Sequence, residues 1–177
     1  MKIWGAISNA VTGWMMILRG EPGWRERFSI STPGLIIALI IYACAAFLAV
    51  AIASTSIGMP SLPGVLAAMF VLGLPVIALV LTLLGTRMGL KSNEPIYPIL
   101  VPGTYVLTAF LLIEGALAMI GGPVVMLAWV GLGYLLYRLA RAATGWNLGI
   151  AAAFAVLTVV LLVAMRMALY MLSNPGT

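Results

Sequence analysis

The chain has 177 residues, of which 64% are hydrophobic and only 7% are charged, and its formal net charge is +5. So apolar a composition excludes an ordinary soluble domain and predicts an integral membrane protein. The basic residues form no run of five or more, which argues against a polybasic arm for nucleic acid. With no histidine and one cysteine, Cys44, the chain can supply neither a histidine base or ligand nor an internal disulfide.

The first twenty residues, 1–20, carry an amphipathic pattern with apolar side chains at helical spacing on one face and polar side chains on the other. The segment is too short and too polar to span a membrane. Trp4 and Trp14 lie on its apolar face, which predicts an interfacial anchor on the cytoplasmic leaflet. Trp24, in the loop at 21–34, is expected at the same headgroup level. Two interpretations stay open: lipid or curvature sensing, and an anchor that packs against the bundle.

Five long apolar stretches follow this segment. They cover Leu35–Ser54, Leu62–Leu84, Ile96–Ile120, Val124–Leu139 and Leu148–Leu172, and the fourth needs Tyr137–Ala143 to reach full length. A helix needs roughly 20 apolar residues to cross a hydrocarbon core about 30 Å thick. We therefore predict an all-α fold, a polytopic membrane bundle of five transmembrane helices over 35–172. An N-terminal interfacial amphipathic helix precedes the bundle, and a short outer tail follows at 173–177.

The basic residues predict how this bundle is oriented. If the N-terminus is inside, eight of the nine basic residues lie on the inner side: Lys2, Arg19, Arg25, Arg27, Arg87, Lys91, Arg138 and Arg141. The positive-inside rule then places the N-terminus in the cytoplasm and the C-terminus outside. The bias toward Ala, Gly, Val and Leu is typical of a multi-pass protein of the bacterial inner membrane, whose outer side is the periplasm.

Small residues in the first span predict close helix packing. Ala45, Ala49 and Ala53 recur every four residues, and small side chains at this spacing let two helix backbones approach. We expect this stripe to face other helices, in the same chain or in a partner.

Prolines mark two further places in the spans. Pro75 lies in the middle of the second span, where a kink is expected because proline removes a backbone hydrogen bond. Pro95, Pro98 and Pro102 fall within eight residues at the start of the third span. We expect an extended, re-entrant or kinked segment there, acting as a hinge or as a docking surface.

Glu114 and Arg166 are the acid and the base that lie inside predicted spans. Each is six residues before the outer end of its span, and both spans run from inside to outside, so the two charges share one depth. An unpaired charge at a helix centre costs about 2.5–3.5 kcal/mol on insertion scales, which favours pairing. Three interpretations remain: a salt bridge between two helices, an Arg166 that reaches outward to headgroups, and part of a proton or ion relay.

The layout resembles the Ypt-interacting protein (Yip) family. The points of resemblance are five spans in about 170 residues, a cytoplasmic N-terminus and a tryptophan-containing lead, Gly23-Trp24-Arg25, before the first span. This resemblance implies a five-span membrane fold and little chemistry.

The sequence favours a non-enzymatic scaffold, or an accessory or assembly subunit of a membrane complex. No catalytic motif is present, and no metal, cofactor or nucleic acid is expected. The expected partners are the lipid bilayer and either a membrane protein or a second copy of the chain. One alternative is a small transporter or channel component with a path near Pro75, the Pro95–Pro102 segment and the pair Glu114–Arg166. Another is a subunit of a pigment or quinone complex.

Overall fold

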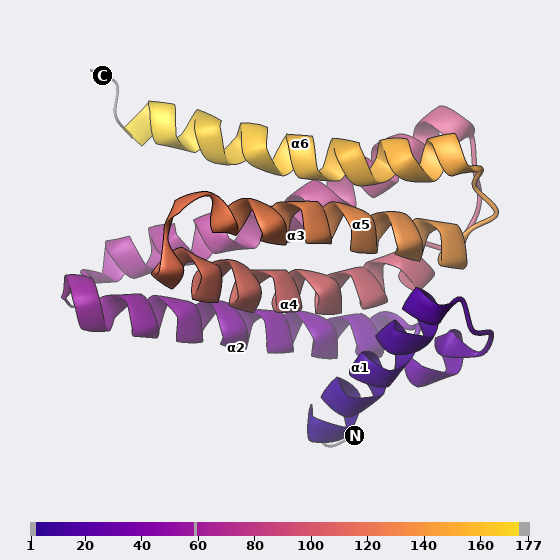
Figure 1. Cartoon of the computed structure of the whole chain (residues 1–177), viewed down its shortest axis with the longest axis horizontal. Helices are drawn as coiled ribbons and strands as arrows, with labels where there is room; N and C mark the ends of the chain where they lie inside the picture. Colours follow the sequence, from indigo (N-terminus) through magenta and orange to yellow (C-terminus); the bar gives the residue numbers. More distant parts are fainter. Residues whose placement is uncertain (1–2, 59, 174–177) are drawn as a thin grey trace.

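The computed structural model describes residues 3–58 and 60–173, and the described residues form helices and loops without a strand (Figure 1). The elements in chain order are α1 (Ile3–Arg19), η1 (Trp24–Arg27), α2 (Thr32–Ile57), α3 (Leu62–Leu90), α4 (Tyr97–Ile120), η2 (Gly122–Val124), α5 (Val125–Ala143) and α6 (Leu148–Ser173). Five of these helices, α2 to α6, are long and apolar enough to cross a membrane. The predicted all-α fold with five membrane-spanning helices is confirmed. Lys2 and positions 174–177 of the expected tail lie outside the described residues.

Two helices are longer than the apolar stretches indicate. α2 begins at Thr32 because the Ser31 hydroxyl accepts a hydrogen bond from the Gly34 amide and Pro33 suits the first turn. α3 continues to Leu90, six residues beyond the end of its apolar stretch at Leu84. Its 29 residues are about 44 Å long, so its polar last turns extend beyond a hydrocarbon core of about 30 Å.

The start of α4 is helical, which corrects the expectation of an extended or re-entrant segment, whereas the alternative of a kink stays a prediction. The helix begins at Tyr97 and continues without interruption to Ile120. Pro95 precedes it, Pro98 lies in the first turn, where a helix needs no amide donor, and Pro102 is inside the helix. The Pro98 carbonyl loses its usual donor, because Pro102 has no N–H. One lost bond is tolerated in a helix so deeply packed.

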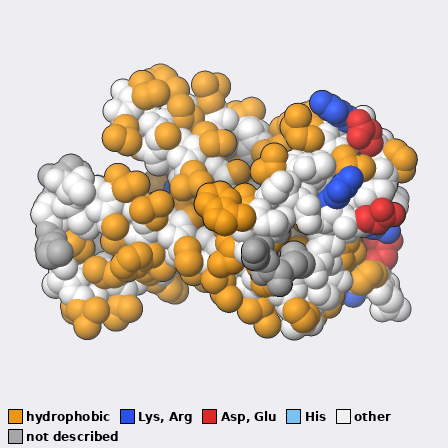
Figure 2. Space-filling view, turned by 90° about the horizontal axis from the view of Figure 1, so that it is seen from below, with side chains coloured by type: hydrophobic (Ala, Val, Ile, Leu, Met, Phe, Trp, Pro, Cys, Tyr) orange, Lys and Arg blue, Asp and Glu red, His pale blue; other side chains and the backbone are white. Residues whose placement is uncertain are grey.

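The five long helices form a closed bundle. α4 packs against α2 and α5, α6 packs against α5 and α3, and α3 closes the ring by contacting α2 and α4. The short helix α1 crosses one end of the bundle obliquely and packs on α4 and α5 (Figure 1). Lysine, arginine and acidic side chains gather at this same end of the face shown in Figure 2. We refer to it below as the charged end.

The core is concentrated toward the charged end. The buried residues of α3 lie between Leu74 and Leu83, and those of α6 between Ala151 and Leu162. In α4 they run from Pro98 to Leu111, within the first two thirds of the helix. The opposite end of the bundle, which we call the far half, is therefore packed more loosely. Glu114 and Arg166 both belong to the far half.

Candidate functional site

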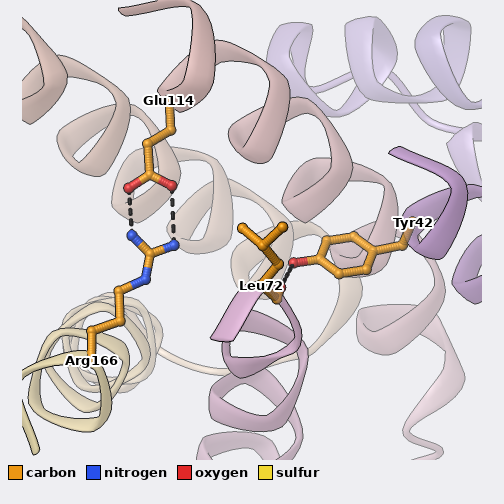
Figure 3. A network of polar contacts seen from close by, with 4 residues as sticks. All are labelled: Tyr42, Leu72, Glu114 and Arg166. Carbon is orange, nitrogen blue, oxygen red and sulfur yellow. Dashed lines mark hydrogen bonds and ion pairs between the residues drawn. The ribbon is translucent and has the colours of Figure 1, made fainter. Parts of the chain in front are cut away.

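The most polar place inside the bundle is the contact between Glu114 of α4 and Arg166 of α6 (Figure 3). Arg166 donates from Nη1 to Glu114 Oε1 at 2.6 Å and from Nη2 to Oε2 at 3.0 Å. The two side chains are only 14% exposed for Glu114 and 24% exposed for Arg166. Paired N–H donors facing both carboxylate oxygens are the strongest geometry that this pair of groups adopts. The structure therefore brings together the two charges that the sequence places at one depth.

An aromatic ring from a third helix supports the pair. The guanidinium carbon of Arg166 lies 4.9 Å from the centroid of the Trp129 ring, on α5. The Trp129 ring in turn meets Phe110 of α4 edge-to-face at 5.3 Å. A cation over an indole face contributes about 0.5–2 kcal/mol, more where water is excluded. The site thus links α4, α5 and α6, although α4 and α6 have little direct backbone contact.

A second polar contact lies beside the ion pair. Tyr42 of α2 donates its hydroxyl hydrogen to the backbone carbonyl of Leu72 in α3 (Figure 3). Leu72 is in the turn before Pro75, next to Val71, whose carbonyl loses its usual donor because proline has no N–H. The Tyr42 contact therefore joins α2 to α3 beside this weakened turn. Pro75 itself is buried inside a continuous α3.

A third polar contact joins α3 to α6 in the core. The hydroxyls of Thr82 and Thr158 are 2.7 Å apart, so one donates to the other. Each hydroxyl also lies 2.8 Å from a carbonyl one turn earlier in its own helix, Ala78 for Thr82 and Phe154 for Thr158, and the accepting hydroxyl can donate its own hydrogen there. Sequence analysis singled out neither threonine, nor Tyr42 or Trp129. Mid-span threonines are common in membrane helices, because their hydroxyls can bond to their own backbone. Only the packing of the helices shows which threonine hydroxyls contact each other.

At the charged end, an arginine of α5 caps the end of α1, and an arginine of η1 caps the end of α5. Arg138 of α5 donates to the carbonyls of Ile17 at 2.9 Å and Leu18 at 2.6 Å, in the last turn of α1. Arg25 of η1 donates to the Ala143 carbonyl at 2.7 Å, in the last turn of α5. The last carbonyls of a helix lack intrahelical donors and carry partial negative charge, so both contacts are favourable. These two basic residues therefore hold α1 and η1 against the bundle.

The three predicted anchor tryptophans have different surroundings. Trp14 is buried, and its indole N–H donates to the Pro102 carbonyl at 3.1 Å. Trp24 is buried too, edge-to-face with Phe28 and with the Arg25 guanidinium 5.4 Å from its ring. Only Trp4 is exposed, at 83%. The expected anchor is therefore divided, because half of the apolar face of α1 is taken up by contacts with the bundle.

The alanine stripe of α2 faces the bundle only at its start. Ala45 is buried, Ala49 is half-buried and Ala53 is exposed. Four residues turn a helix by about 400°, so a stripe with this spacing rotates about 40° per step away from a straight contact. The buried side of α2 instead includes Ala38 and Tyr42.

An apolar groove separates α4 from α5 on the surface of the far half. Its volume is about 150 Å³, and its lining includes three small residues, Ala109, Ala128 and Gly131. A Cβ atom added at Gly131 would meet no atom within 4 Å, so the groove is open above this glycine.

Comparison of the sequence with protein-family models, with curated proteins and with solved structures finds no match.

Proposed function

We propose that the chain is a non-enzymatic scaffold, or an accessory or assembly subunit, of a complex in the bacterial inner membrane. The observation that carries this proposal is the use of the polar side chains inside the spans. Glu114 bonds to Arg166, Tyr42 to a backbone carbonyl and Thr82 to Thr158, each contact joining two helices. Polar groups engaged in this way stabilise one arrangement of helices, which is what a platform for another membrane protein requires. The resemblance to the Yip family stays a prediction from layout.

The groove between α4 and α5 is the surface that best suits a partner's transmembrane helix. Ala109, Ala128 and Gly131 line the groove with small side chains. Small residues let a second helix approach closely in a membrane, where lipid offers no hydrophobic driving force for association. The groove lies within two candidate spans, so a partner would reach it from the plane of the membrane.

The experiment is extraction into native nanodiscs, followed by mass spectrometry of whatever co-purifies with the chain in stoichiometric amount. Gly131→Leu would fill the groove, while Gly115→Leu is a matched control. Gly115 is an exposed glycine of the far half, away from the groove lining, and it also has open space around it. We expect a partner that the wild type and Gly115→Leu retain and Gly131→Leu loses. Purification of the wild type as a single chain or pure homo-oligomer with bound solute would contradict the proposal.

A small transporter or channel component is the second candidate, because one observation favours it. Glu114 and Arg166 are partly exposed and lie in the loosely packed far half, where a solute could reach them. In proteoliposomes, Glu114→Gln would then abolish a proton leak or solute flux without changing the stability of the bundle. The scaffold proposal instead expects this substitution to lower stability.

The proposed orientation is a cytoplasmic N-terminus and a periplasmic C-terminus. It is supported by the position of Arg19, Arg87 and Arg141, which lie in the last turns of α1, α3 and α5. In a Cys44→Ala background, a membrane-impermeant thiol reagent applied from outside should label Asn174→Cys. It should leave Asn93→Cys unlabelled until the membrane is opened. The reverse pattern would invert the topology.

A further inference from the structure

The helix α1 has three different sides, and in the part of the chain that the structure describes only one of them packs against protein. At 100° per residue, its buried side comprises Ala6, Ala10, Gly13, Trp14 and Ile17, which face the bundle. A second side is apolar but exposed, with Trp4, Val11 and Met15 at 83%, 60% and 47%. A third side, directly next to the second, is polar and exposed, with Ser8, Thr12 and Arg19. An ordinary surface helix has only two sides, one against the core and one in water.

The depth of α1 indicates what covers the exposed apolar side. The Trp14 indole reaches the carbonyl of Pro102, five residues inside the start of α4, which is about 8 Å along the helix axis. A helix that lies in the membrane interface is buried about 5–10 Å into the boundary between headgroups and acyl chains. Counted from the first residue of α4, the contact of Trp14 therefore lies within the range of depth that an interfacial helix occupies.

The charge around α1 indicates the kind of lipid. Among the described residues, five exposed basic side chains lie at the charged end, namely Arg19, Arg25, Arg27, Lys91 and Arg141. Three exposed carboxylates accompany them, Glu21, Glu26 and Glu94. The difference, five minus three, leaves two positive charges in excess at the surface. Basic residues near the surface of an anionic leaflet each contribute about 1 kcal/mol to binding.

We propose that α1 is a lipid-binding element in which Trp4, Val11 and Met15 insert into the leaflet at the charged end, with a preference for anionic headgroups. The polar side, with Ser8 and Thr12, faces water. The buried side couples α1 to the bundle through Trp14. This proposal concerns the surface of the chain that meets lipid, and it does not depend on the scaffold function.

The test measures where each side of α1 lies, in the full chain reconstituted in nanodiscs that contain anionic lipid. In a Cys44→Ala background, a nitroxide is attached at Val11→Cys, on the apolar side, or at Ser8→Cys, on the polar side. Both positions are exposed, so the labels need not disturb the fold. Collisions of the label with oxygen, which concentrates in the acyl region, are compared with collisions with a water-soluble nickel chelate.

We expect the ratio of oxygen to chelate collisions to be several-fold higher at Val11 than at Ser8. Met15→Cys and Thr12→Cys form a second matched pair with the same expectation. Equal ratios on the two sides, or a higher ratio at Ser8, would overturn the proposal. Protection of Val11 from both reagents, with spin–spin broadening between labels, would also overturn it, because a second copy of the chain would then cover this side.

The lipid preference is tested by the same labels in nanodiscs of zwitterionic lipid alone. We expect the collision ratio at Val11 to be lower than in anionic nanodiscs but still above that at Ser8, because the contacts of Trp14 and Arg138 keep α1 on the bundle when the attraction to the headgroups is lost. The ratio should recover when anionic lipid is restored. High salt should reduce the ratio in anionic nanodiscs, because screening weakens the attraction of the basic side chains. A ratio at Val11 that is the same in both lipids would overturn the preference for anionic headgroups.

Discussion

Replacing only one member of the pair Glu114–Arg166 should destabilise the bundle more than replacing both. Each single substitution, Glu114→Gln or Arg166→Met, leaves one ionised group without its partner among apolar side chains. Breaking a fully buried pair costs about 3–5 kcal/mol. Insertion scales give about 2.5–3.5 kcal/mol for one charge at a helix centre. Because both side chains keep some exposure, we expect each single substitution to lower the free energy of unfolding by about 2–3 kcal/mol.

The double substitution should recover part of this loss, because no unpaired charge remains. Residues in direct contact show coupling energies of about 0.5–3 kcal/mol, and the two short hydrogen bonds favour the upper half of that range. The measurement is equilibrium unfolding of the four variants in mixed micelles of increasing SDS content. The four variants form a double-mutant cycle, and a second cycle, in which Thr158→Val takes the place of Arg166→Met, provides the control. Thr158 is two turns earlier on the same helix and bonds to Thr82, so its effect should add to that of Glu114→Gln.

Simple additivity of Glu114→Gln and Arg166→Met, equal to that of the control cycle, would refute this reasoning. It would mean that the two side chains do not interact in the membrane and that Arg166 reaches the outer headgroups instead.

Two further substitutions test how α1 is held. Trp14→Phe removes the indole donor but keeps an aromatic ring, so it should cost about 1–2 kcal/mol, whereas the same change at the exposed Trp4 should be nearly neutral. The measurement is the free energy of unfolding of both variants in mixed micelles. Equal losses for Trp14→Phe and Trp4→Phe would contradict a stabilising bond from Trp14 to Pro102. Gly13→Ala would place a Cβ 2.4 Å from the Phe28 ring and should destabilise by about 1–3 kcal/mol. Gly5→Ala, which meets no atom within 4 Å, should instead gain up to about 1 kcal/mol, and a loss there would show that α1 is held differently.

The amino-acid pattern by itself determines the class of the fold. Five apolar stretches of sufficient length predict five helices, because an apolar segment in a bilayer must satisfy its own backbone hydrogen bonds. The pattern predicts the starts and ends of these helices less well. α3 extends six residues beyond its apolar stretch, since a helix can continue into the headgroup region where its side chains become polar. The prolines of α4 mislead for a similar reason, because a buried helix tolerates the single backbone bond lost at Pro102.

The candidate site was partly predictable. The common depth of Glu114 and Arg166 follows from counting residues along two parallel helices, because the rise per residue is constant. That these two helices point the charges at each other depends on the order of helices around the bundle, which periodicity does not contain. The same holds for Trp129 beside Arg166 and for Tyr42 beside Leu72.

The clearest difference between sequence and tertiary structure is in α1. Its apolar residues form one broad face in the sequence pattern, which predicts an interfacial anchor and leaves open whether this anchor also packs against the bundle. The structure divides this face between the bundle, which Trp14 contacts, and a surface that includes Trp4. Hydrophobic burial is non-directional, so a pattern of apolar side chains shows that they avoid water but not whether protein or lipid covers them. Only the packing of α4 and α5 against α1 decides this for each residue.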